Sequence, residues 1–240
     1  MDTNRLQEWN CWYQLMNCGY PLKASGETDF PCISGGRVGE GRVYVQMGKI
    51  DKIDYAQWCE GVAKGRSYVS DGYAHALEFT VGGKTIGGSA AIDGPGAVPV
   101  KAKVAFAAEP LLGTGPGAVV PKTATRLVEI LVNGQVAATK EVPADDKEHE
   151  LSFDLKIDRS SWVALRHFPQ LHTNPVTVIV GGKPIRASRK SALWCIGVIE
   201  QLWKVRGQGI LAAERDEAKK TFDWAIEEYK RIAAESPEGS

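Results

Sequence analysis

The chain has 240 residues, enough for one large domain or two modest ones. It is 43% hydrophobic and 24% charged, which is typical of a soluble globular protein. Its 29 basic and 29 acidic residues give a formal net charge of zero, so a nucleic-acid partner is not expected. A membrane partner is not expected either, because no apolar run is long enough to span a bilayer. The first residues lack the basic and apolar regions of a signal peptide, and the sequence does not indicate a compartment.

Cysteine usage argues against a zinc ribbon and against a dithiol redox motif. The five cysteines are scattered along the chain and form no CxxC pair. Cys11 and Cys18 lie seven residues apart on a predicted helix, too far apart along it to be bridged. Reduced, mostly buried thiols are therefore expected.

The amino-terminal part predicts a mixture of helices and short strands. Apolar side chains recur at helical spacing over residues 6–16, which we interpret as a core-facing helix rather than a ligand site. Residues 21–25 predict a short strand, and the loop after it carries Asp29. A further strand is expected at residues 42–47. Asp54 is expected to cap the next helix, with Gln57 three residues later as in a capping box.

From Arg66 the apolar pattern changes to a period of two, and the turns become rich in glycine. The Asn133–Gly134 pair is the strongest short hairpin signal in the chain. About seven short strands separated by such turns predict an antiparallel β-sandwich of immunoglobulin-like type. The clearest strands are expected at 76–81, 100–106, 127–132, 151–157, 161–165 and 176–180.

Two amphipathic helices are expected at the carboxy-terminal end. Ser188 is placed to cap the first helix, which should end at Gly207. The second carries apolar residues on one face, from Ala218 to Ile232, and each helix needs a surface to cover. The predicted fold class is therefore α+β.

Several segments together resemble one enzyme family. They are Trp12–Tyr20, Ser25-Gly26-Glu27-Thr28-Asp29, Gly41–Val45, Gly65–Gly72, the Asn133–Gly134 hairpin and His172–Val176. In this order they resemble the carboxy-terminal half of the carbaryl-hydrolase-like metallohydrolases, within the polymerase-and-histidinol-phosphatase (PHP) superfamily.

The resemblance implies a domain layout and one metal ligand. Residues 1–65 would be the last βα elements of a PHP-like (β/α) barrel, 66–186 the β-sandwich and 187–240 the carboxy-terminal helices. Members of the family bind divalent metals such as zinc or manganese, and their last barrel strand supplies an Asp in a Gly-Ser/Thr-Asp motif. Gly26-Glu27-Thr28-Asp29 matches this motif with one residue inserted, so Asp29 is the expected metal ligand.

The family's other ligand motifs are missing from this sequence. None of its four histidines lies in a His-x-His pair, and a catalytic metal needs at least three protein ligands. The chain is therefore expected to be a fragment, a remnant or one part of a split enzyme, inert in isolation, with no tightly bound metal. Its expected partners are the missing barrel half or a second copy, because Trp9, Trp12 and Tyr13 would leave apolar surface uncovered.

Two functions follow as hypotheses. The first is part of a metal-dependent hydrolase, in which a metal-bound hydroxide attacks an ester, amide or phosphoester. Four residues are then candidates for binding the substrate, namely His75, His172, Arg37 and Arg42. The alternative is a non-catalytic β-sandwich module that binds carbohydrate or protein, with Trp162 as a possible stacking surface.

Overall fold

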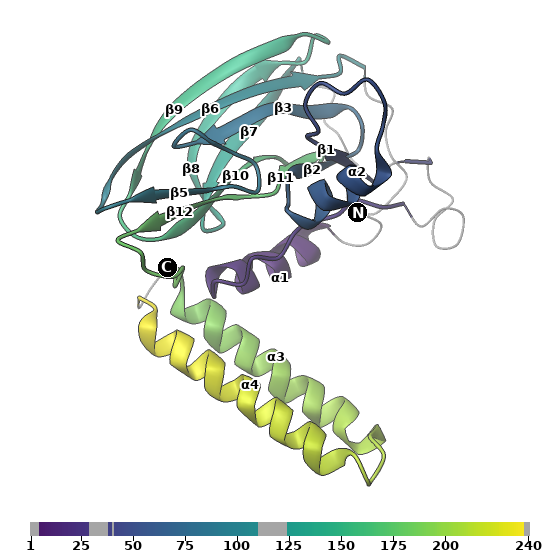
Figure 1. The fold of residues 1–240 in the computed structure, drawn as a ribbon, viewed down its shortest axis with the longest axis vertical. Helices are drawn as coiled ribbons and strands as arrows, with labels where there is room; N and C mark the ends of the chain where they lie inside the picture. Colours follow the sequence, from purple (N-terminus) through teal and green to yellow (C-terminus); the bar gives the residue numbers. More distant parts are fainter. Residues whose placement is uncertain (1–4, 29–37, 40, 110–123, 238–240) are drawn as a thin grey trace. The chain divides into compact units, whose positions relative to one another are not determined.

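The computed structural model describes residues 5–28, 38–39, 41–109 and 124–237, and it has the predicted mixed α+β character (Figure 1). The chain divides into two compact units. The first contains Met1–Trp9 and Lys23–Lys183, and the second contains Asn10–Leu22 and Pro184–Ser240. The predicted boundary at 186/187 lies close to the division at 183/184, whereas the one at 65/66 falls inside the first unit.

The first unit contains an eight-stranded sheet. Its strands follow the order β1-β2-β11-β10-β12-β5, and β7 pairs with both β10 and β8. All these pairs are antiparallel except β12 with β5, which is parallel. The strands are β1 (Arg42–Val45), β2 (Ser67–Ser70), β5 (Ser89–Ile92), β7 (Thr125–Val132), β8 (Gln135–Pro143), β10 (Ser161–His167), β11 (Leu171–Thr173) and β12 (Val176–Val180).

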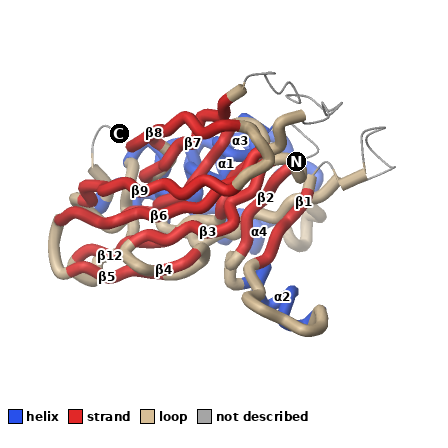
Figure 2. The backbone as a smooth tube through the Cα atoms, turned by 90° about the horizontal axis from the view of Figure 1, so that it is seen from above, coloured by secondary structure: helices blue, strands red, loops and turns tan. Residues whose placement is uncertain are grey.

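A second, four-stranded antiparallel sheet has the order β4-β3-β6-β9, and Figure 2 shows β3, β6 and β9 running side by side. Its strands are β3 (Ala74–Val81), β4 (Lys84–Thr85), β6 (Gly96–Phe106) and β9 (Glu148–Ile157). One core joins the two sheets, since Phe79 and Val100 from the small sheet cluster with Ile130 and Leu165 from the large one. All four side chains are at most 1% exposed. Along β6 every second residue from Val98 to Phe106 is buried, which supplies part of this shared core.

Along the sequence, the chain moves repeatedly between the sheets. It leaves the large sheet after β2, returns to it for β5, leaves again for β6, and returns for β7 and β8 before β9. The predicted turn at Asn133–Gly134 is confirmed as the β7–β8 connection, with φ values of +53° and +85°. Both residues need the left-handed region, which Asn and Gly tolerate best.

The predicted helix after β1 is confirmed as α2 (Tyr55–Ala63), and the side chain of Asp54 accepts a hydrogen bond from the Gln57 backbone. The strand predicted at residues 21–25 is wrong, because this segment pairs with a side chain instead of a strand. Asn174 Oδ1 accepts from the Ala24 amide at 2.8 Å, and its Nδ2 donates to the Ala24 carbonyl at 3.3 Å. The asparagine side chain thus takes the place of a neighbouring strand.

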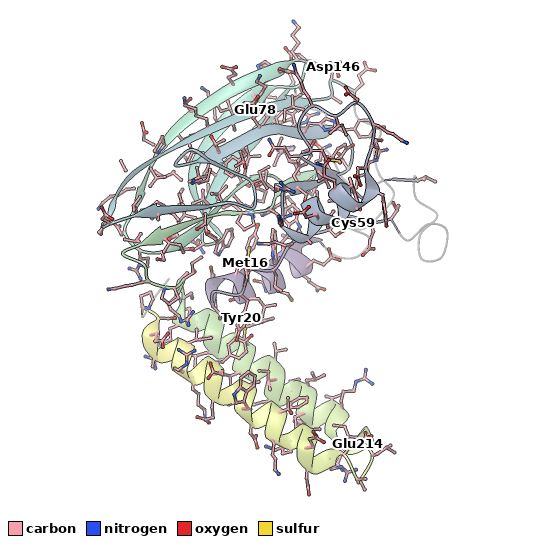
Figure 3. All side chains as sticks on the ribbon, viewed as in Figure 1. Met16, Tyr20, Cys59, Glu78, Asp146 and Glu214 are labelled. Carbon is pink, nitrogen blue, oxygen red and sulfur yellow. The ribbon has the colours of Figure 1, made fainter. Side chains whose placement is uncertain are left out.

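The second unit contains the end of α1 (Arg5–Asn17) and a helical hairpin. The hairpin consists of α3 (Arg189–Arg206), a short 3-10 turn η1 (Gly207–Gly209) and α4 (Arg215–Glu235), which lie side by side (Figure 1). The predicted cap is confirmed, since the Ser188 hydroxyl accepts from the Ser191 amide. Tyr20, labelled in Figure 3, packs its ring 5.7 Å from that of Tyr229 on α4.

No helix among the described residues is long and apolar enough to cross a membrane. The expectation that Trp9 contributes to an uncovered apolar surface is wrong, because only 6% of it is exposed. Its ring lies edge-on to those of Phe168 and His172 in the first unit, with centroids 5.6 and 4.9 Å away. Trp12 and Tyr13 are half-buried.

Candidate functional site

The structure brings together two of the five predicted site residues, Arg42 and His75. Asp29 and Arg37 lie outside the described residues. His172 is fully buried on the opposite face of the large sheet, away from the other two. We name the group formed by Arg42, Tyr44, Tyr68 and His75 the Arg42–His75 cluster.

Strand pairing puts three members of the cluster on one face of the large sheet. Tyr44 on β1 lies opposite Tyr68 on β2, and Arg42 lies two residues before Tyr44, on the same face. The two tyrosine rings are stacked, with centroids 5.0 Å apart and planes 9° apart. His75, from β3, meets Tyr44 edge-on at 5.0 Å, and its Nδ1 lies 2.9 Å from the Tyr68 hydroxyl. An aromatic cluster with a polar edge results.

Burial shifts the pKa values of two side chains in the cluster, His75 and Tyr68. It lowers the pKa of His75, an effect to which the nearby Arg42 charge adds, although the Gly72 backbone and Asp71 oppose it. Burial also raises the pKa of Tyr68. At neutral pH a neutral His75 therefore accepts a hydrogen bond from the protonated Tyr68 hydroxyl.

Arg42 is held between two glycines. Its Nε donates to the Gly39 carbonyl, and its Nη1 donates to the Tyr44 hydroxyl at 3.4 Å. A Cβ on Gly39 would lie 2.8 Å from Nε, and one on Gly72 would lie 2.5 Å from Nη1. Both glycines have a positive φ, +72° and +89°. Only glycine supplies both the backbone conformation and the space that the guanidinium occupies.

The described end of the Gly26–Asp29 motif is bound beside Arg42. Thr28 Oγ1 accepts from the Gly39 amide at 3.2 Å and donates to the Gly41 carbonyl at 3.4 Å. Gly26 packs so closely on the Arg42 backbone that a Cβ would collide with the Arg42 carbonyl. The residue immediately before Asp29 is therefore fixed at the entrance to β1, next to the cluster.

A buried polar network, not predicted from the sequence, supports the turn that contacts Arg42. Asp71 accepts from the Tyr73 amide at 2.9 Å and from Gln170 Nε2 at 2.8 Å. Gln170 Oε1 lies 3.1 Å from His167 Nε2, while His167 Nδ1 lies 2.8 Å from the Leu127 carbonyl. Burial lowers the pKa of His167, and these two acceptors act in the opposite direction. The network fixes the 71–73 turn, and with it Gly72.

His172 belongs to the interior. It is 0% exposed, and it lies opposite Val69 in the β11–β2 pairing, so its side chain points to the other face from Tyr68. Its Nδ1 lies 2.7 Å from the Thr173 carbonyl. Burial lowers its pKa to about 3, so the ring is neutral in the folded protein at ordinary pH. The sequence pattern places His172 beside a strand but does not reveal which face it takes.

Two further expectations meet the structure here. Across residues 5–28, 38–39, 41–109 and 124–237, no group of three or more His, Cys, Asp and Glu side chains could hold a metal ion. These residues therefore do not by themselves fit the metal centre that the family resemblance implies.

Trp162, the expected stacking surface for a glycan, is only 1% exposed. Its ring is therefore not available for stacking on a sugar.

Comparisons with protein-family models, with curated proteins and with solved structures each found no match to this chain.

Proposed function

We propose that this chain is the carboxy-terminal portion of a metal-dependent hydrolase that acts on an ester, amide or phosphoester. In this proposal, Asp29 is one ligand of a divalent metal, zinc or manganese, and the other ligands lie outside the described residues. The chain contributes the Arg42–His75 cluster as a wall of the substrate site. Residues 1–65 would derive from a PHP-type barrel, and the two sheets would form an immunoglobulin-like sandwich.

The observation that carries the proposal is the attachment of Thr28 beside Arg42. A hydrolase must present its metal ligand and its substrate-binding groups within a few ångströms of one another. Thr28 immediately precedes the expected ligand, and its hydroxyl is bonded to the backbone of Gly39 and Gly41. Gly39 is in turn bonded to the Arg42 side chain. Thr28, the residue before the expected ligand, and the cation at position 42 therefore belong to one local structure.

The chemistry of the cluster suits an oxygen-rich substrate. The guanidinium of Arg42 is a permanent cation, and its Nη2 end would donate to a carboxylate, phosphate or polarised carbonyl oxygen. His75 is neutral because of its burial, so it adds no second positive charge. The half-buried Tyr44 ring, which is stacked on the buried Tyr68 ring of the core, supplies an apolar wall against which the rest of the substrate would lie. Substrate positioning, rather than proton transfer, is the role proposed for these residues.

The metal part of the proposal can be tested by paramagnetic broadening, which detects weak binding by a single carboxylate. The 15N-labelled chain would be titrated with Mn2+, and amide signals followed in the parent, in Asp29→Asn and in Asp51→Asn as the matched control. We expect selective broadening at Thr28, Gly39 and Gly41, lost in Asp29→Asn and retained in Asp51→Asn. Broadening confined to the acidic turn at residues 145–150, with none near Thr28, would overturn the assignment of Asp29.

The hydrolase part needs an activity readout. Purified chain would be incubated with a p-nitrophenyl ester and with bis(p-nitrophenyl) phosphate, each with added Mn2+ or Zn2+. Inertness is expected if the chain needs further ligands. If the parent chain turns over a substrate and Asp29→Ala does not, the expected inertness is wrong. That result would still support the proposal that the chain belongs to a hydrolase. Turnover that persists unchanged in Asp29→Ala and in Arg42→Ala would exclude the proposed site.

A further inference from the structure

Two cysteines from opposite ends of the sequence meet in the second unit. Asn17 Nδ2 donates to Ser191 Oγ at 3.2 Å, and Ser191 lies one helical turn before Cys195 on the same face of α3. Cys18, the next residue after Asn17, lies in the same buried cluster as Cys195. Both thiols are free and buried, at 1% and 3% exposure, in a small apolar cluster with Ala192, Ile232 and Ala233.

The surroundings make the two sulfurs unequal. The thiols hydrogen-bond to one another, and this contact lowers the pKa of Cys195 while raising that of Cys18. Tyr229 on α4 also donates a hydrogen bond to Cys195, which further lowers its pKa. Burial acts against the thiolate at both positions. Arg186, whose Nη1 donates to the Cys18 carbonyl at 3.0 Å, is the cation beside Cys18. Cys195 is thus the more acidic thiol of the pair.

We propose that Cys18 and Cys195 form a redox-active pair that hydrogen peroxide converts into a reversible disulfide. The Cys195 thiolate attacks one peroxide oxygen, the O–O bond breaks, and the hydroxide released takes up a proton to become water. Cys195 is then a sulfenic acid. The Cys18 sulfur, as it loses its proton, attacks the Cys195 sulfur and expels the second water. Two thiols and one peroxide give one disulfide and two waters, and a dithiol reductant reverses the reaction.

Because both thiols are buried, only a small oxidant is expected to reach them. Peroxide is little larger than water, so a local opening of the 10–22 segment admits it, whereas an aromatic disulfide reagent needs far more space. Exposed Cys11 provides an internal comparison, because it is accessible to both. The bridge, once formed, would fasten residues 10–22 covalently to α3. Residues on both sides of it belong to the second unit.

The test is peptide mapping of the intact chain after brief treatment with peroxide, without reduction. We expect a Cys18–Cys195 cross-linked peptide with a mass loss of about 2 Da, reversed by dithiothreitol. In Cys18→Ser the resolving thiol is missing, so dimedone should trap a sulfenic acid at Cys195. In Cys195→Ser neither the bridge nor an adduct at Cys18 should form. Tyr229→Phe should slow bridge formation by about threefold to tenfold, because the thiolate loses a donor.

Cys11→Ser is the matched control, since it removes a thiol outside the pair and should leave the bridge unchanged. Mapping of the parent chain needs no substitution, so its result stands even if a variant fails to fold. Two results would overturn the proposal: peroxide products at Cys11 or Cys59 with both paired thiols still reduced, or a dimedone adduct on Cys18 in place of Cys195.

Discussion

Replacing Gly72 with Ala should disrupt the Arg42–His75 cluster through a single methyl group. Gly72 has a φ of +89°, and an added Cβ would lie 2.5 Å from Arg42 Nη1 and 2.8 Å from Cζ. The left-handed backbone alone costs an L-residue about 1–2 kcal/mol. The methyl would also displace the guanidinium from its bonds to Gly39 and Tyr44, and loss of bonds to a charged group costs about 1–3 kcal/mol. We therefore expect a total loss of about 2–5 kcal/mol in unfolding free energy.

Gly83→Ala is a matched control that separates these two contributions. Gly83 has a φ of +75°, and a Cβ there would meet no atom within 4 Å. It should therefore carry the backbone cost of about 1–2 kcal/mol and nothing further. In an Arg42→Ala background, the collision at Gly72 disappears, so Gly72→Ala should then cost about as much as Gly83→Ala.

Urea unfolding followed by tryptophan fluorescence would measure all four variants, since Trp9 and Trp162 are buried in the first unit. The double-mutant cycle between Gly72→Ala and Arg42→Ala should give a coupling energy of about 1–3 kcal/mol. If Gly72→Ala costs no more than Gly83→Ala, or if its cost is the same with and without Arg42, then the guanidinium does not occupy the space beside Gly72 and the reasoning fails.

Two further predictions concern buried polar side chains. His172 has a folded pKa of about 3, below its ordinary unfolded value of 6.5. Between these two values the unfolded chain binds a proton at His172 that the folded chain does not bind. The free energy of unfolding should therefore fall by about 1.4 kcal/mol per pH unit as the pH drops below 6.5. His172→Gln should flatten the dependence of urea midpoints on pH relative to the parent chain; equal slopes in the two proteins would contradict the assignment. Asn174 is 0% exposed and bonds to Ala24 and Ser67, so Asn174→Asp should lose its donors and cost about 2–4 kcal/mol. It should also speed proteolysis within residues 20–28, and unchanged cleavage there would show that Asn174 does not hold this segment.

Local chemistry made much of the fold predictable. Asp54 and Ser188 were expected as helix caps, and each accepts the expected backbone hydrogen bond. Asn133–Gly134 was expected as a hairpin turn, and its positive φ values match. In each case the residues that decide the structure lie within four positions of one another, so the sequence contains the whole interaction.

The errors and omissions depend on partners distant in the sequence. Residues 21–25 are predicted as a strand, but the hydrogen-bonding partner of Ala24 is the Asn174 side chain, 150 positions away. His172 and His75 look alike in sequence, yet the β11–β2 pairing turns His172 to the face opposite Tyr68, whereas His75 reaches Tyr68 from the other sheet. The pairing of Cys18 with Cys195 likewise needs the α3 contact that only the structure supplies.

The candidate site was predictable in part, for the same reason. Arg42 and His75 were selected from sequence as separate candidates, and no local pattern linked them. Their association comes from Tyr44 and Tyr68, which the β1–β2 pairing places opposite one another. The supporting Asp71–Gln170 hydrogen bond joins residues 99 positions apart, and no sequence motif indicates it. Sequence motifs thus identified residue types, and tertiary pairing selected which of them meet.

The repeated exchange of strands between the two sheets has a consequence for how the first unit assembles. Neither sheet is built from one continuous stretch of chain, since β5 interrupts the small sheet's strands and β9 interrupts the large sheet's. Closing either sheet requires contacts between residues far apart in sequence, which makes folding slow and strongly cooperative. A cut at residue 65 would deprive β2 of β1, its partner at the end of the large sheet. Residues 42–180 should therefore fold and unfold as one cooperative unit.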